Sequence, residues 1–406
     1  MEVKIIDTAY SGYGVAKDDK GKVIFIPYSV EGDILDITVI KESSRFSYAS
    51  VNKIIEASPY RITPKCRYAG ICGGCLFNHI DYNKQLYIKH NIAANAVRNI
   101  DYKSGIKIIY NKNYNYRLRV NMAAFKGKSG FFKFKTNDFI SIDECIILKE
   151  SLFKKIKDFV YENNLTGNVY AIENNNSNAF AFVQSDKKIN IKSFYKYFDG
   201  ISIKHNKTVK RYGDLYMFYK TKHGDIGIGH KTFFQGNLYL LNEFQDEAVK
   251  YLTHSDNTVI ELYSGSGFFT AAVENKIKSF GKDYKFISSE INRDSVFAAN
   301  KYGFNIINED ALTTLKNIYY DIDVLILDPP REGIDKKIVK EIIRIKPEKI
   351  IYISCDPMTF ARDINLLKDY YKLLDLNIID MFADTYHIEF ISYLEYKNQK
   401  NIILIY

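Results

Sequence analysis

The last third of the chain alternates short apolar runs with stretches of helical pattern, and this alternation restricts the fold more than any other feature. The runs are NTVIELY, KFISSEI, DVLILDPP and KIIYISC, in that order. Runs of about four to six buried residues, separated by helices, are typical of a parallel sheet with helices on both faces. We therefore predict a doubly wound, Rossmann-like α/β domain over residues 231–406.

The two regions before it have different patterns. Residues 1–57 alternate apolar and polar side chains between glycines, which predicts a small β-barrel of the OB-like kind. Residues 58–230 begin with a cysteine-rich loop, continue with a predicted helix near Lys84–Asn99, and then contain the strand-like stretches YRLRVNMAAF and GFFKFK. The sequence thus predicts a multidomain α/β protein with a central α+β domain between the barrel and the C-terminal domain.

The composition excludes some functional classes and favours one kind of partner. No run approaches the ~20 apolar residues that cross a bilayer, and the first residues carry no secretory pattern, so we expect a cytoplasmic protein with no membrane partner. In that compartment cysteines act as ligands or catalysts more often than as disulfides. The net charge of +9, with 33 Tyr and 27 Phe, favours a nucleic acid, because phosphates attract cations and bases stack on aromatic rings.

Four of the five cysteines suggest a metal site. Cys66, Cys72 and Cys75 have the spacing C-x5-C-x2-C within a glycine-rich loop, and Cys145 is a distant fourth candidate. Four thiolates suit either an iron–sulfur cluster or tetrahedral zinc. Three clustered cysteines with a remote one favour a 4Fe–4S cluster, while His79 leaves a Cys3His zinc site as the alternative.

The stretch VIELYSGSGFFT predicts a strand, a glycine turn and a helix, which together allow a nucleotide-like ligand to approach the backbone. Glu290 ends the next strand, about 20 residues on, where an acid can bind ribose hydroxyls. Asp310 follows a third short run, and Asp328 follows the fourth. The missing phosphate-binding features favour S-adenosylmethionine over a dinucleotide.

Cys355 ends the apolar run KIIYISC and precedes an acid, a proline and a helical stretch. It is either a small buried residue at the end of a strand or a nucleophile where a strand opens into a site. The other four cysteines form one candidate ligand set and leave Cys355 unpaired. A helix beginning just after it would favour the thiolate, so we predict the nucleophile.

Several of these motifs occur together in one known family. The stretches are SGYGVAKDDKGKVIFIPYSVEGD, PKCRYAGICGGC, FFQGN, ELYSGSG, LDPPREG, YISCDPMTFARD and HIE, together with remote Cys145. In this order they resemble the RNA uracil-C5 (5-methyluridine) methyltransferases, in the branch with an N-terminal TRAM barrel and an iron–sulfur cluster. The resemblance covers nearly the whole chain and implies a class I methyltransferase fold for its last third.

The resemblance also implies roles for particular residues. Cys355 corresponds to the nucleophile, Glu389 to the general base, and Phe233 to an aromatic residue that stacks near the target base. The implied cluster ligands are Cys66, Cys72, Cys75 and Cys145. The implied S-adenosylmethionine site consists of Gln235, Tyr263, Glu290, Asp328 and Asp310. His387, next to the base, is expected to be structural.

RNA is the implied partner, with no obligate protein partner, and 23S ribosomal RNA is the favoured substrate. Transfer RNA U54 is the alternative, because relatives with this layout also modify it. Arg117, Arg119 and Lys126 are candidates for phosphate contacts. Two rival functions are methylation of a base nitrogen, which the arginine after DPP and Cys355 argue against, and RNA binding through an inactive transferase domain.

Departures from the family pattern concern two loops and the tail. Ser264 and Phe268 replace more usual residues of the glycine turn, and FADTYHIE differs from the usual sequence before the final glutamate, which leaves the shape of that loop open. The tail KNQKNIILIY extends past the usual end and is a candidate for an added strand.

Overall fold

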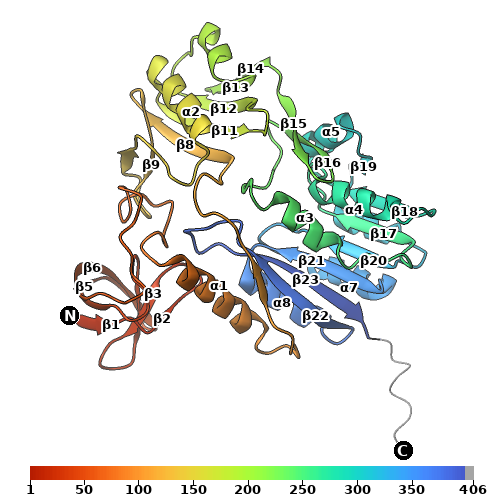
Figure 1. The fold of residues 1–406 in the computed structure, drawn as a ribbon, viewed down its shortest axis with the longest axis horizontal. Coiled ribbons are helices and arrows are strands. Elements are labelled where there is room, and N and C mark those ends of the chain that lie inside the picture. The colour runs from red at the N-terminus through yellow and green to blue at the C-terminus, as the bar shows by residue number, and fades with distance from the viewer. Residues whose placement is uncertain (398–406) are drawn as a thin grey trace, which may run out of the picture.

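The computed structural model describes residues 1–397, which form three parts around a common centre (Figure 1). The candidate strand in the tail lies outside these residues. No helix in the described part of the chain is both long and apolar enough to cross a membrane.

The N-terminal part is a curled six-stranded sheet in the order β1-β5-β6-β4-β3-β2. Its strands are β1 (Glu2–Lys4), β2 (Asp7–Thr8), β3 (Gly14–Lys17), β4 (Val23–Ile26), β5 (Ile34–Glu42) and β6 (Phe46–Glu56). Alternate apolar residues of these strands meet in a small core of their own, as the alternating pattern predicts. The buried carboxylate of Asp33 accepts hydrogen bonds from Arg61 and from the backbone of Ser58, and so fixes the segment that leaves the sheet.

The central part is a seven-stranded sheet in the order β10-β9-β8-β11-β12-β13-β14. Its elements are β8 (Arg119–Phe125), β9 (Lys128–Phe132), β10 (Phe139–Ser141), α2 (Glu150–Glu162), β11 (Gly167–Glu173), β12 (Ala179–Ser185), η1 (Ile191–Lys196), β13 (Gly200–His205) and β14 (Thr208–Gly213). The apolar face of α2 packs on this sheet and completes a second core.

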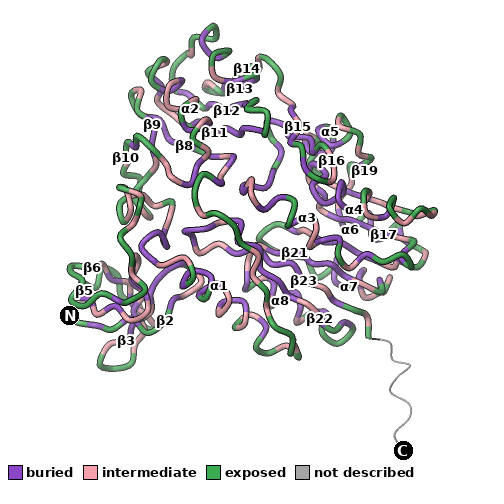
Figure 2. Tube along the Cα trace, viewed as in Figure 1, coloured by how far each residue is buried: buried purple, intermediate pink, exposed green. Residues whose placement is uncertain are grey.

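The C-terminal part contains an eight-stranded sheet in the order β19-β18-β17-β20-β21-β23-β22-β7. Its own strands are β17 (Thr258–Leu262), β18 (Lys285–Ser289), β19 (Ile306–Ile307), β20 (Val324–Leu327), β21 (Lys349–Ser354), β22 (Tyr371–Ile379) and β23 (Glu389–Tyr396). The helices are α3 (Leu241–Val249), α4 (Phe268–Lys278), α5 (Arg293–Lys301), α6 (Ala311–Lys316), α7 (Lys336–Ile345) and α8 (Pro357–Leu367). The first five strands are parallel, which confirms the predicted doubly wound α/β sheet, and its central strands are buried (Figure 2).

Three pieces of the middle region pack with the C-terminal part. Helix α1 (Tyr82–Val97) packs against α8, and β7 (Lys107–Ile109) extends the large sheet as a parallel edge strand (Figure 1). The hairpin of β15 (Tyr216–Thr221) and β16 (Gly224–Gly229) packs against α5. Apolar periodicity indicates which face of each element is buried, but not which sheet that face covers. The predicted region 58–230 therefore does not pack as one continuous unit.

Candidate active site

A cavity of about 1030 Å³ opens between the central and C-terminal parts. It is lined by nearly all of the residues that the sequence predicts for the site, which come from residues 66–389. These are Cys66, Cys72, Cys75, Cys145, Phe233, Gln235, Tyr263, Glu290, Asp328, Cys355 and Glu389. The carboxyl ends of the parallel strands face this cavity, which is where α/β sheets of this kind bind ligands.

The register of two strands brings Cys355 and Glu389 together. β23 runs antiparallel to β21, and Ser354 at the end of β21 pairs with Phe390. Cys355 follows Ser354, and Glu389 precedes Phe390, so the two residues are opposite each other at the same edge of the sheet. Cys355 is partly buried, whereas Glu389 is buried. A thiol and a carboxyl group thus form part of one wall of the cavity.

The electrostatics of this pair differ from the sequence-based expectation. Burial raises the pKa of the Cys355 thiol to about 12, and the neighbouring carboxyls of Glu389 and Asp328 act in the same direction. Burial likewise raises the pKa of Glu389 to about 8 and that of Asp328 to about 7. The expected lowering of the Cys355 pKa by α8 is therefore wrong, because burial and two acidic neighbours outweigh the dipole of one helix.

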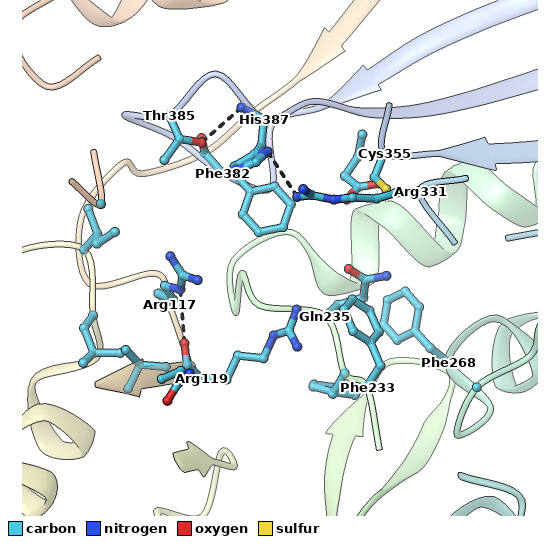
Figure 3. Close-up of a pocket in the computed structure, with 18 of the residues that line it drawn as sticks. Arg117, Arg119, Phe233, Gln235, Phe268, Arg331, Cys355, Phe382, Thr385 and His387 are labelled. Atoms are coloured by element: carbon cyan, nitrogen blue, oxygen red, sulfur yellow. Dashed lines mark hydrogen bonds between the residues drawn. The ribbon is translucent and has the colours of Figure 1, made fainter. Parts of the chain in front are cut away.

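Arg331 is the cation that opposes this effect. It lowers the pKa values of Cys355 and Glu389, and its guanidinium lies 3.4 Å from Nδ1 of His387 (Figure 3). Burial, with the charge of Arg331, lowers the pKa of His387 to about 4, so this imidazole is neutral at pH 7. A neutral ring held by neighbours agrees with the predicted structural role of His387.

The glycine turn after β17 leaves backbone open to the cavity. Tyr263 and Gly265 both have positive φ, of 63° and 56°, and a Cβ added at Gly265 would meet no atom within 4 Å. Glu290 accepts a hydrogen bond of 2.9 Å from the backbone N–H of Gly265, which ties the turn to the end of β18. Among the described residues, the buried oxygens Oε1 of Gln235 and Oγ of Ser266 have no hydrogen-bond partner. Such atoms suit a polar ligand.

Asp310 lies outside the large cavity. It borders a smaller pocket of about 150 Å³ that shares Tyr263 and Glu290 with the large one. Its carboxylate caps α6 by accepting hydrogen bonds from the N–H groups of Leu312 and Thr313. Local capping therefore accounts for an acid at this position, and a ligand contact there remains a prediction.

The four cysteines of the predicted metal site share one wall of the cavity but do not form a closed cage. Burial raises the pKa values of Cys72, Cys75 and Cys145, and the thiol of Cys145 raises that of Cys75 further. Within residues 1–397, no group of three or more His, Cys, Asp or Glu residues is arranged to hold a metal ion. The donor chemistry of four thiols fits a sulfur-ligated cluster.

The zinc alternative gains no support from His79. This residue is buried beside Arg61 and the backbone of Ser29 and does not line the cavity. Gly73, in contrast, is needed for the shape of the cysteine loop. A Cβ there would lie 2.8 Å from the Cα of Phe134, so only glycine fits without a shift of backbone.

Of the three predicted phosphate contacts, two are in the cavity. The guanidinium of Arg119 lies 4.2 Å from the ring centre of Phe233, an exposed aromatic residue at the cavity edge (Figure 3). Arg117 donates a hydrogen bond to the backbone oxygen of Arg119. Lys126 is in a turn after β8 and does not line the cavity.

One cavity neighbour had no signal in the sequence. The hydroxyl group of Tyr10, from the N-terminal sheet, donates a hydrogen bond of 3.3 Å to the carbonyl oxygen of Cys355. These two residues are 345 positions apart, and no local pattern predicts such a contact. The N-terminal sheet thus touches the loop that carries the candidate nucleophile.

Comparison with known proteins agrees with this arrangement. Residues 305–397 match the tRNA (uracil-5-)-methyltransferase family model, and residues 1–51 match the TRAM domain model. An RNA methyltransferase of Nanoarchaeum equitans is 30% identical over 429 aligned positions, covering 96% of this chain and 92% of that protein. The chain belongs to the RNA uracil-5-methyltransferase family. Its N-terminal sheet is a TRAM domain, and the protein is an RNA uracil-C5 methyltransferase.

Two further comparisons concern Pyrococcus abyssi. Its tRNA (uracil(54)-C(5))-methyltransferase is 27% identical, with 94% of this chain and 97% of that one aligned. The crystal structure of a P. abyssi tRNA (uracil-54, C5)-methyltransferase, in complex with S-adenosyl-L-homocysteine, has a TM-score of 0.78 at 22% identity, covering 97% of this chain and 100% of that one. This structural likeness shows that the two proteins share a fold.

We expect Arg331→Met to slow alkylation of Cys355 at pH 8. Without the guanidinium the thiol pKa rises, so less thiolate is present, and one pKa unit corresponds to a roughly tenfold change in thiolate. Iodoacetamide labelling followed by peptide mass spectrometry would measure a rate about threefold to tenfold lower. Lys231→Met, which removes another cation of the cavity wall, is the matched control. Unchanged labelling of Cys355 in Arg331→Met would contradict this electrostatic role.

Proposed function

We propose that the protein transfers a methyl group from S-adenosylmethionine to C5 of a uridine in RNA, with Cys355 as nucleophile and Glu389 as general base. The observation that carries the proposal is the opposition of these two side chains across β21 and β23, in a cavity that the glycine turn also faces. Neither residue alone would suggest this chemistry. Together, a thiol can add to C6 and a carboxylate on the same wall can later remove the hydrogen from C5.

The nucleophile is required because C5 of uracil reacts poorly with an alkyl sulfonium. The thiol of Cys355 loses its proton to solvent, its thiolate adds to C6, and the electrons of the C5–C6 double bond move toward O4 as an enolate. S-adenosylmethionine supplies an electrophilic methyl group, which C5 takes with this electron pair, while S-adenosylhomocysteine leaves with the electrons of the broken sulfur–methyl bond. Glu389 then removes the hydrogen from C5, the double bond re-forms, and the C6–sulfur bond breaks to release the thiolate.

The residues around the glycine turn fit the methyl donor. The open backbone at Gly265 allows close approach, and Glu290, which is held by that turn, presents a carboxylate suited to ribose hydroxyls. The unpartnered oxygens of Gln235 and Ser266 can accept hydrogen bonds from polar groups of the ligand. Asp328 follows β20, the strand that lies between β17 and β21 in the sheet, and so stands between this turn and Cys355.

The target base must leave its stack, because C5 and C6 are inaccessible inside folded RNA. Phe233 is 55% exposed at the edge of the cavity, and Arg119 already lies over one face of its ring. We infer that an extruded uracil stacks against this aromatic–cation pair. Flanking phosphates would be attracted by the cations of the rim, so binding weakens as salt rises.

The covalent step predicts a trapped complex. With 5-fluorouridine RNA and S-adenosylmethionine, fluorine at C5 cannot be removed as a proton, so the adduct between Cys355 and C6 should persist in a denaturing gel. Cys355→Ala should abolish it. Failure of the wild-type protein to form an adduct with any uridine-containing RNA would contradict the mechanism.

Glu389 separates the two halves of the reaction. On ordinary uridine RNA, Glu389→Gln should methylate the base once and then retain it covalently, because the hydrogen at C5 is not removed. In the wild-type protein, release should accelerate as pH rises through about 8, because the base must be ionised and burial raises its pKa to about 8. A release rate that does not depend on pH between 6 and 9 would exclude this role.

For the RNA itself, we propose transfer RNA U54 as the substrate. The support is that the matched family model and the P. abyssi relative both name transfer RNA. The motif pattern of the sequence favours 23S ribosomal RNA instead. Both candidate RNAs would undergo the same reaction, so only the RNA that carries the methylated uridine distinguishes them.

Mapping of 5-methyluridine in total RNA, with and without the gene, decides between them. We expect loss of the mark at position 54 of transfer RNA, with the marks of 23S ribosomal RNA unchanged. Cys355→Ala, expressed in the deletion strain, should leave the mark absent, and the wild-type gene should restore it. Loss confined to 23S ribosomal RNA would overturn the substrate proposal while preserving the enzyme class.

We also propose that Cys66, Cys72, Cys75 and Cys145 hold a 4Fe–4S cluster. The support is that four thiols line one wall of the cavity and that three of them belong to a single glycine-rich loop. Addition to C6, methyl transfer and proton removal from C5 need no electron transfer. The cluster would therefore shape the RNA-binding wall and take no chemical part in methylation.

Anaerobically purified protein should show broad visible absorbance with about four iron atoms per chain, as expected for cubane clusters with cysteine ligands. Cys72→Ser should remove the absorbance, while Cys355→Ser, which alters the cysteine outside the set, should retain it. Stoichiometric zinc with no visible absorbance would replace the cluster by a zinc site.

A further inference from the structure

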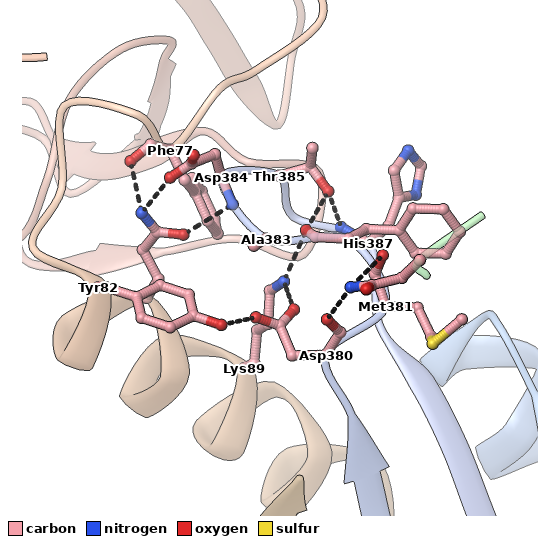
Figure 4. Close-up of polar contacts among 12 residues, drawn as sticks. Phe77, Tyr82, Lys89, Asp380, Met381, Ala383, Asp384, Thr385 and His387 are labelled. Carbon is pink, nitrogen blue, oxygen red and sulfur yellow. Dashed lines mark hydrogen bonds and ion pairs between the residues drawn. The ribbon is translucent and has the colours of Figure 1, made fainter. Parts of the chain in front are cut away.

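A loop of nine residues, Asp380 to Ile388, connects β22 to β23 and ends at Glu389. Side chains of α1, a helix from a distant part of the chain, bind two of its carboxylates and two of its peptide groups (Figure 4). Tyr116 and Asn237 bind further peptide groups of the loop. This loop contains most of the stretch FADTYHIE, which departs from the family pattern. We refer to it as the base loop.

A buried ion pair fixes the first half of the base loop. Nζ of Lys89 lies 2.5 Å from Oδ1 of Asp380, and both side chains are 0% exposed. The same ammonium group donates to the carbonyl oxygen of Phe382 at 3.0 Å, and the hydroxyl of Tyr82 donates to the other carboxylate oxygen of Asp380 at 2.7 Å. One carboxylate therefore binds two side chains from the same face of α1.

A reciprocal amide contact fixes the second half. Gln85, one turn from both Tyr82 and Lys89, donates to the carboxylate of Asp384 at 2.9 Å and accepts from its backbone N–H at 3.0 Å. Asp384 has a positive φ of 60°, a strained backbone for a non-glycine residue that surrounding contacts must hold. The backbone N–H of Phe77 donates to the carbonyl oxygen of Asp384 at 2.9 Å.

These contacts have the character of a positioning device. A buried charge pair adds little net stability over apolar side chains of the same volume, but it accepts only one geometry. Four residues lie between Asp384 and Glu389, and Thr385 continues the chain of hydrogen bonds by accepting from the N–H of His387 at 3.3 Å. The α1 contacts, together with those of Tyr116 and Asn237, thus fix the path by which the chain enters β23.

We propose that Lys89, Gln85 and Tyr82 are positioning residues that hold Glu389 for proton abstraction from C5 of the methylated uridine. This rests on the proposed function, in which Glu389 acts only after methyl transfer. Cys355 and the glycine turn are on other loops, and the α1 contacts reach only the part of the base loop before His387, so disturbing them should slow release more than methyl transfer.

The test uses the full chain, uridine-containing transfer RNA and S-adenosylmethionine with a labelled methyl group. Rapid quenching gives two quantities: the rate of methyl transfer, and the fraction of methylated RNA still attached to protein in a denaturing gel. Lys89→Met combined with Asp380→Asn removes both buried charges. We expect release to slow by about tenfold to a hundredfold, the cost of a small misplacement of a reacting group, with methyl transfer within about threefold of wild type. The attached fraction should rise accordingly.

Tyr82→Phe provides a milder variant if the double variant does not fold. It removes one hydroxyl group from Asp380, and its matched control is Tyr251→Phe, which removes a tyrosine hydroxyl from Asp375 within β22. Tyr82→Phe should raise the attached fraction, whereas Tyr251→Phe should not. Equal effects of the two variants, or a loss of methyl transfer as large as the loss of release, would overturn the positioning role. Absence of any 5-fluorouridine adduct in the wild-type protein would instead overturn the proposed function.

Discussion

β23 runs antiparallel between β21 and β22, and Glu389 is its first residue. In a wholly parallel sheet the start of that strand would lie at the opposite edge from Cys355, which follows the end of β21. The reversed strand brings an amino-terminal end to the carboxyl-terminal edge, and the ladder of hydrogen bonds then fixes the separation of the two groups. The rest of the candidate site is arranged around this pair, because the turn after β17 and the end of β20 open on the same edge.

Burial of the site disfavours the charged forms of its acidic groups. The same enclosure that excludes water raises the pKa values of Cys355, Glu389 and Asp328, so three potentially anionic groups share one wall and resist ionising together. Arg331 offsets part of this effect without closing the cavity. The ionisation of the thiol and of each carboxyl group therefore depends on the other charged groups in the cavity, including those of a bound substrate.

Much of the site could be predicted because its residues follow the ends of apolar runs. A parallel sheet collects those ends at one edge, so Glu290, Asp328 and Cys355 were nominated by local pattern and fold class together. Other features depend on contacts between distant segments, which leave no periodic signal. The hydrogen bond of Tyr10 to Cys355 and the stacking of Arg119 on Phe233 are examples. The ionisation of Cys355 is a third example: a helix start after the strand favours the thiolate, whereas burial and two acidic neighbours, which only the fold reveals, raise the pKa of the thiol.

The base loop also explains how the cysteine loop can matter to a reaction in which it takes no chemical part. Cys75 is two residues before Phe77, whose N–H donates to Asp384 of the base loop, and α1 begins at Tyr82 shortly afterwards. A displacement of the cysteine loop would therefore move Phe77 and the start of α1, and with them the contacts that direct the chain toward Glu389. Backbone hydrogen bonds from Phe77 to Asp384 and from Ile80 to Phe77 connect this segment to the base loop. Order in the cysteine loop and alignment of the base are then two consequences of one packed segment, residues 66–97.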